Sequence, residues 1–236
     1  MKKPVTIIHI GLFVIIATLA FNPLPGWSAP STGSKRQAVI SSGRQQADLA
    51  IKLNNQAKSL YLQGKFAEAE PLQRRVVAIM EKALGKDHPS VAANLNNLSL
   101  LLFAQGKYAD AESISRRELA INEKAYGKDH LLVAKNLDGL AALLYQQGKY
   151  PEAEPLLRRS LSIMEKVHAG KDHSDVAKSL LDLAMLLQAQ GNDREAESLL
   201  RRALEIDEKV LGREHPATNT VRNNLDDLLK KTPKSP

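Results

Sequence analysis

The sequence repeats one short motif four times at nearly constant spacing. Residues 63–70 read Gln-Gly-Lys-Phe-Ala-Glu-Ala-Glu, and the motif returns with small changes around Gly106 and Gly148 and in a more divergent form around Gly191. The four glycines, counted from Gly64, are 42, 42 and 43 residues apart. A period of this length is typical of stacked repeats, in which each supersecondary unit buries its apolar face against its neighbours. The repeat therefore predicts an elongated array.

Each repeat carries two helical patterns, one on either side of its glycine. Before the second glycine, Val91, Leu95, Leu98 and Leu102 follow the spacing i, i+4, i+7, i+11, which predicts an amphipathic helix A. A second amphipathic pattern, helix B, follows the glycine. We expect the glycine to adopt a left-handed conformation and to end helix A. Each helix B also places an acid four residues before an arginine, a pair worth roughly 0.2–0.5 kcal/mol. The four pairs are Glu70–Arg74, Glu112–Arg116, Glu154–Arg158 and Glu197–Arg201.

The loops from helix B to the next helix A have a common Gly-Lys-Asp-His pattern, with Gly-Arg-Glu-His in the last. We expect the glycine to end helix B and the acid, as in Asp87, to cap the next helix. An extra residue near His168-Ala169 accounts for the spacing of 43. The four loop histidines do not predict a metal site, because equivalent loops should lie ~10 Å apart whereas zinc holds its ligands at about 2 Å. Loop packing or capping is the expected role of His88, His130, His173 and His215.

The first 29 residues have the pattern of a signal peptide. Lys2 and Lys3 precede an apolar run over 5–21, and turn-forming residues follow at 22–26. Cleavage is expected after Ala29, with Ala20 as the competing site and an uncleaved membrane anchor as the third alternative. This segment predicts export to the periplasm or beyond, or anchoring in the inner membrane if it is retained. Residues 30–46 are expected to form a linker and residues 232–236 a tail, and the chain has no cysteine.

These motifs resemble the tetratricopeptide repeat family, and more narrowly the 42-residue repeats of kinesin light chains and their exported bacterial counterparts. The resemblance rests on Leu95-Asn96-Asn97-Leu98 of helix A, the Gln-Gly-Lys-Tyr turn, the Ala-Glu of helix B and the Gly-x-Asp-His-Pro loop. It implies an all-α fold, a right-handed superhelical α-solenoid of about four helix-turn-helix repeats with a C-terminal capping helix. The expected solenoid spans 47–231, with repeats at 47–90, 91–132, 133–175 and 176–218 and the cap at 219–231.

The sequence departs from the family pattern at three places. Gln56 occupies a leucine position, and Asn192-Asp193 replace Lys-Tyr in the fourth turn. The N-terminal segment and the lack of a heptad stalk do not match a cytosolic motor-cargo protein, so that role is not carried over.

The resemblance implies that helix A of each repeat lines a concave face that binds another protein or an extended peptide. Amides can pair with a peptide backbone, lysines with carboxylates, and aromatic rings with apolar side chains. Alternatively, the repeated asparagines bond neighbouring helices. A membrane-tethered assembly factor or chaperone of the cell envelope is the alternative function. The candidate partner-binding residues are Asn54, Lys58, Tyr61, Asn96, Phe103, Lys135, Asp138, Tyr145, Lys178 and Asn223.

The sequence contains no pattern that favours catalysis, a metal or a cofactor. It has no His-Glu-x-x-His, no Gly-x-Ser-x-Gly, no phosphate-binding glycine loop and no cysteine nucleophile. The net charge of +7 is spread along the chain, and the arginine pairs of helix B alternate with glutamates, so a nucleic-acid partner is not expected. The chain is predicted to be a non-enzymatic protein-binding module that contacts a membrane only through its N-terminal segment.

Overall fold

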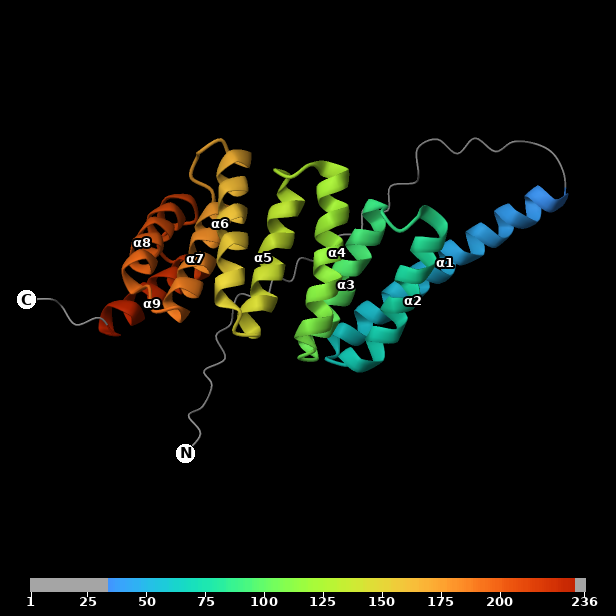
Figure 1. Ribbon diagram of the computed structural model, residues 1–236, viewed down its shortest axis with the longest axis horizontal. Helices are drawn as coiled ribbons and strands as arrows, with labels where there is room; N and C mark the ends of the chain where they lie inside the picture. Colours follow the sequence, from blue (N-terminus) through green and yellow to red (C-terminus); the bar gives the residue numbers. More distant parts are fainter. Residues whose placement is uncertain (1–33, 232–236) are drawn as a thin grey trace, which may run out of the picture.

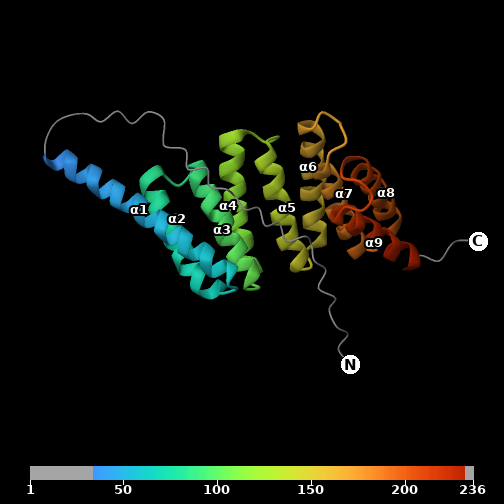
Figure 2. The same ribbon diagram turned by 180° about the vertical axis from the view of Figure 1, so that it is seen from behind.

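The computed structural model describes residues 34–231, with side chains from residue 43 onward, and this part of the chain contains nine α-helices and no strand (Figure 1). Successive helices form antiparallel hairpins that stack side by side, as the view from behind also shows (Figure 2). This confirms the predicted all-α repeat solenoid. The helices are α1 Ser34–Leu62, α2 Phe66–Leu84, α3 Pro89–Ala104, α4 Tyr108–Tyr126, α5 Leu131–Gln146, α6 Tyr150–Val167, α7 Ser174–Ala189, α8 Asp193–Val210 and α9 Pro216–Lys231.

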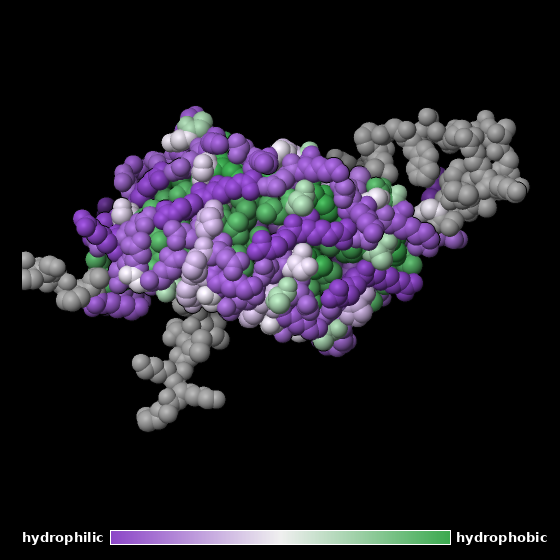
Figure 3. Space-filling model, viewed as in Figure 1, coloured by the Kyte–Doolittle hydropathy of each residue, from purple (hydrophilic) through white to green (hydrophobic). Residues whose placement is uncertain are grey.

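The odd-numbered helices, which correspond to helix A, form the centre of the array. Each of α3, α5 and α7 buries eight residues, whereas α2, α4, α6 and α8 bury four or five each. Small side chains allow this close packing, since Ala141 and Ala184 of helix A and Ala153 of helix B are almost fully buried. Polar side chains cover the ridges of the surface, and apolar ones show in the furrows between them (Figure 3). An odd-numbered helix therefore depends on the neighbouring repeats to cover it.

The predicted glycine turns are confirmed. Gly64, Gly106, Gly148 and Gly191 have φ of 73°, 73°, 72° and 82°. The next residue closes the turn, because its N–H donates to a carbonyl five residues earlier, as in Lys65 to Leu60 at 2.9 Å and Lys149 to Leu144 at 2.9 Å. This is the Schellman pattern of helix ends. Each turn thus reverses the chain within three residues and fixes the geometry of the A–B hairpin.

The glutamates of helix B do more than pair within their own helix. All four predicted Glu–Arg pairs are present, at 2.8, 2.8, 2.9 and 2.7 Å. Glu70 also accepts hydrogen bonds from Gln105 at 2.9 Å and Lys107 at 2.7 Å in the next repeat. The bond from Lys107, supported by those from Arg74 and Gln105, outweighs burial and lowers the pKa of Glu70 to about 2. The same carboxylate therefore links two successive repeats.

The loop histidines cap the odd-numbered helices. Nδ1 of His88, His130 and His173 accepts the backbone N–H two residues later at 3.1 Å, and His215 does the same at 3.2 Å. This confirms the capping role of the histidines and shows that the expected capping by the loop acids was wrong. Those acids lie one residue too early, and the three aspartates among them pair with lysines of the following helix B instead. The pairs are Asp87–Lys124, Asp129–Lys166 and Asp172–Lys209, at 2.6, 3.0 and 3.5 Å.

The N-terminal boundary of the array differs from the prediction. Helix α1 begins at Ser34, inside the linker expected over 30–46. Proline is absent after residue 30 in this stretch, so nothing in the backbone prevents the helix from extending outward beyond its hairpin. The capping helix α9 likewise starts at Pro216, three residues before 219. The predicted signal peptide at 1–29 and the tail at 232–236 lie outside the described residues.

The charged C-terminal end of α9 agrees with its expected capping role. Asp226, Asp227, Lys230 and Lys231 are exposed. Within residues 34–231, no helix is both long and apolar enough to cross a membrane.

Two glycines offer a matched test of this architecture. A methyl group would meet no atom within 4 Å at either Gly148 or Gly139, but only Gly148 has a positive φ. Gly148→Ala should therefore lower the free energy of unfolding by roughly 1–2 kcal/mol, the cost of a left-handed L-residue. Gly139→Ala, inside helix α5, should raise it by about 0.5–1 kcal/mol. Urea denaturation followed by circular dichroism measures both, and equal effects of the same sign would contradict the assigned turn.

Candidate functional site

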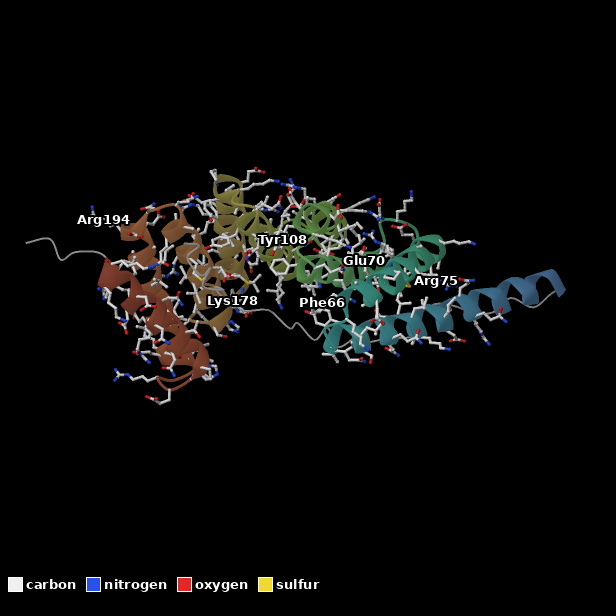
Figure 4. The ribbon with its side chains drawn as sticks, turned by 90° about the horizontal axis from the view of Figure 1, so that it is seen from below. Phe66, Glu70, Arg75, Tyr108, Lys178 and Arg194 are labelled. Atoms are coloured by element: carbon white, nitrogen blue, oxygen red, sulfur yellow. The ribbon has the colours of Figure 1, made fainter. Side chains whose placement is uncertain are left out.

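A groove runs across the odd-numbered helices α3, α5 and α7. Its cavity volume is about 180 Å³, and side chains from α4 and α6, including Ser115 and Leu157, form its floor. The groove lies on the helix A side of the array. In the view from below, Lys178 of α7 is on the opposite side from Arg194 of α8 (Figure 4).

The groove brings together six of the ten predicted site residues. Asn54, Lys58 and Tyr61 of α1 and Asn223 of α9 do not line it. The six are Asn96, Phe103, Lys135, Asp138, Tyr145 and Lys178. Sequence reasoning missed Asp175, Asp182 and Gly139, which also line the groove. Gly139 takes the place that Asn97 has in the preceding repeat, and a methyl group added there would meet no atom within 4 Å.

The aromatic wall of the groove is held by intramolecular pairs. Phe103 contacts Tyr108 with ring centroids 5.4 Å apart, and Tyr145 contacts Tyr150 at 5.1 Å. In each pair, the last turn of a helix A meets the first residue of the following helix B. Aromatic pairs at these distances add roughly 0.5–1.5 kcal/mol beyond the area they bury. The rings are therefore already positioned without a partner, and each also has a structural role that the sequence reading did not include.

The other end of the groove is charged. Lys178 pairs with Asp182 one turn later at 2.5 Å, and Asp138 of α5 lies close to both. The Oδ1 atom of Asp138 is buried and accepts no hydrogen bond from the described residues. Burial raises the pKa of Asp138 to about 7, although the charge of Lys178 opposes the shift. Asp138 is therefore held in a site that disfavours its ionised form.

A buried polar layer lies beneath the groove between α4 and α5. Nδ2 of Asn122 donates to Oδ1 of Asn136 at 3.3 Å, and Nδ2 of Asn136 donates to Oγ of Ser115 at 3.4 Å. Glu118 belongs to the same layer, where burial raises its pKa to about 8 against a hydrogen bond from Asn136. At neutral pH this carboxyl is mainly protonated, so the layer contains hydrogen-bonding groups with little net charge.

Replacing Asp138 or Asp182 by asparagine should change the free energy of unfolding in opposite directions. Because the pKa of Asp138 is raised in the folded state, the parent should lose stability as pH rises from about 4 to about 7. Asp138→Asn should remove that loss and raise the free energy of unfolding at pH 8 by about 1–3 kcal/mol, with little effect near pH 4. Asp182→Asn should destabilise the protein at pH 8, because it removes the carboxylate that lies 2.5 Å from the ammonium group of half-buried Lys178. Chemical denaturation across this pH range measures both variants, and a destabilising Asp138→Asn at pH 8 would contradict the burial argument.

Comparison with known proteins agrees with this geometry. The tetratricopeptide repeat family matches residues 48–122, 92–166 and 176–217. A variant of the kinesin-light-chain TPR-like repeats of Podosopora anserina is 27% identical, with a TM-score of 0.68 over 76% of this chain and 84% of that one.

Two more distant structures share the fold alone. BtubC from P. vanneervenii is 22% identical, with a TM-score of 0.67 over 85% of this chain and 84% of its own. The apo form of RapI is 16% identical, with a TM-score of 0.62 over 83% and 74%. No curated protein sequence matches the chain at a significant level. Because its family profiles cover more than half of the sequence, the chain belongs to the tetratricopeptide repeat family.

Proposed function

We propose that this protein binds an extended segment of another protein in the groove formed by α3, α5 and α7. Tetratricopeptide repeat folds are typical scaffolds for protein–protein interaction, and the family is generally non-catalytic. The observation that carries the proposal is the groove itself, which joins preformed aromatic rings to a charged end. Its volume of about 180 Å³ is below the roughly 300–1,000 Å³ of small-molecule pockets. It suits one or two side chains of a longer ligand.

The chemistry of the groove supports a peptide. Phe103 and Tyr145 supply an apolar contact, and half-buried Asn96 offers an amide that can both donate to and accept from a backbone. The expected partner is therefore an extended peptide segment that offers an apolar side chain to the aromatic rings and backbone groups to the amide. The four predicted residues outside the groove, on α1 and α9, would extend the contact only with a partner longer than the groove.

We further propose that the chain is exported. The support is the basic start followed by an apolar run over 5–21. If the N-terminal segment is not cleaved, the protein would be a membrane-tethered assembly factor, which is the alternative to an exported binding module.

An alkaline phosphatase fusion after Ala47 tests the direction of transport. Activity is expected, because the enzyme needs the disulfides that form in oxidising compartments. An inactive fusion, with the full-length chain confined to the cytosol, would contradict export.

The groove can be tested with a variant that fills it. Gly139 faces open space within the groove, so Gly139→Trp should occupy it without a backbone clash. Peptides selected from a random display library on the parent should bind this variant at least tenfold more weakly, and Asn96→Ala should cost about 1–2 kcal/mol of binding. Fluorescence anisotropy with the labelled peptides measures both affinities.

The matched control is Arg116→Ala, which removes an exposed side chain from helix α4 and should leave binding unchanged. Peptides that bind Gly139→Trp as tightly as the parent, or that lose affinity with Arg116→Ala instead, would place recognition on the other face and refute the proposal.

A further inference from the structure

The α6–α7 connection, taken with the first turn of α7, differs from the three equivalent segments at two positions whose side chains are of types that can bind a metal. At the end of helix B, His168 stands where the other loops have Leu84, Tyr126 and Leu211. Two residues after the capping histidine, Asp175 stands where they have Ser90, Leu132 and Ala217. Both differences occur close to His173, which has an equivalent histidine in each of the other three loops.

The same loop contains the inserted residue that lengthens the repeat to 43. Ala169 follows His168 with φ of 53°, the one non-glycine residue with positive φ in the described part of the chain. A left-handed conformation is strained for alanine, which has a Cβ atom. The insertion therefore gives the loop a different path and places His168 over His173, with ring centroids 3.6 Å apart.

The three side chains meet at distances close to those of a tetrahedral metal site. Oδ2 of Asp175 lies 3.5 Å from Nε2 of His168 and 3.6 Å from Nδ1 of His173. Three such ligand atoms, one from each residue, all lie within 4.8 Å of one another. Ligands about 2.1 Å from a zinc ion in a tetrahedron are ~3.4 Å apart. Two of the three edges already have nearly this length.

Packing alone accounts for the rings but not for their polar atoms. At the α4–α5 connection, the ring of Tyr126 stacks on the capping histidine His130, with centroids 4.8 Å apart. An aromatic ring can therefore pack on a capping histidine without any role in binding a ligand. A phenyl or phenol ring would serve that purpose at position 168. Instead, Nε2 of His168 is buried and makes no hydrogen bond to the described residues, and the polar atom that it contacts there is Oδ2 of Asp175, at 3.5 Å. A buried nitrogen of this kind is costly unless something binds it.

We propose that His168, His173 and Asp175 bind a transition-metal dication of the zinc class, with solvent completing the coordination. Two imidazoles and one carboxylate are ligands that zinc accepts. Calcium and magnesium are not expected, because they require six or more oxygens or a largely retained water shell. The side chains are half-buried, so an ion can enter from solvent.

Binding requires a local rearrangement that itself can be observed. The imidazole planes are within 12° of parallel, and lone pairs in parallel planes cannot converge on one ion. At least one ring must rotate, which breaks the stack. Coordination through Nδ1 of His173 would also displace the hydrogen bond that this atom accepts from the N–H of Asp175 at 3.1 Å.

The test is titration of the full, untagged chain with Zn²⁺ by calorimetry and with Co²⁺ by visible absorption. The parent should bind one Zn²⁺ per chain, give Co²⁺ bands of four- or five-fold coordination, and show no response to Mg²⁺ or Ca²⁺. His168→Tyr and Asp175→Ser, which restore the side chains of sibling loops, should each weaken binding by at least tenfold, since even second-shell losses cost 10–100-fold. Proton NMR of the histidine rings should show the stack opening on zinc addition.

The control is His130→Asn in the α4–α5 loop, where asparagine retains a capping acceptor. It should leave zinc affinity unchanged. Unaltered zinc binding in both His168→Tyr and Asp175→Ser, or a parent that fails to saturate at one ion, would overturn the proposal. Should His168→Tyr fail to fold, as judged by circular dichroism, Asp175→Ser decides the question.

Discussion

The structure depends on the contact between successive repeats. A single A–B hairpin cannot bury both sides of its helix A, and the side chains of α3, α5 and α7 become core only when the neighbouring repeats stack on them. The repeated carboxylates Glu70 and Glu112 fix the register of this stacking, because each binds an arginine in its own helix and a glutamine and a lysine in the next repeat. Hydrophobic burial supplies most of the stabilisation, and these bonds determine how far one hairpin is shifted against the next.

The fold was predictable because the sequence repeats at a nearly constant interval. Glycine spacing, helical faces and Glu–Arg pairs are local or recur at a constant interval, so helices, turns and their order follow from the sequence alone. The N-cap did not follow in the same way, because the sequence left His88 open between loop packing and capping and offered Asp87, one residue earlier, as the cap. What the period could not show is which side chains meet across about 35 to 40 positions, such as Gln105 with Glu70.

The candidate site was predictable only in part, for the same reason. Counting helix positions placed Asn96, Phe103 and Lys178 on the groove side. It could not show that Phe103 contacts Tyr108, that Gly139 lines the groove or that Glu118 is buried. The capping histidines of different repeats were not expected to share an ion, because equivalent loops should lie ~10 Å apart. His168 was not considered as a candidate ligand, because it is an extra histidine outside the repeated pattern.

The groove and the proposed metal cluster share one residue. Asp175 lines the groove and contributes to the raised pKa of Asp138 and to the field around Lys178, and it also belongs to the proposed metal cluster. An ion that draws this carboxylate toward His168 would reduce the negative charge beside Asp138. Ionisation of Asp138 would then become easier, and the charged end of the groove would change.

Thermodynamic linkage makes this effect reciprocal. If the ion alters the affinity of the groove for a peptide, the peptide must alter the affinity for the ion by the same factor. The coupling needs no long pathway, because a single side chain contacts both sites. The one loop that differs from the equivalent loops therefore lies beside the groove proposed to bind a peptide.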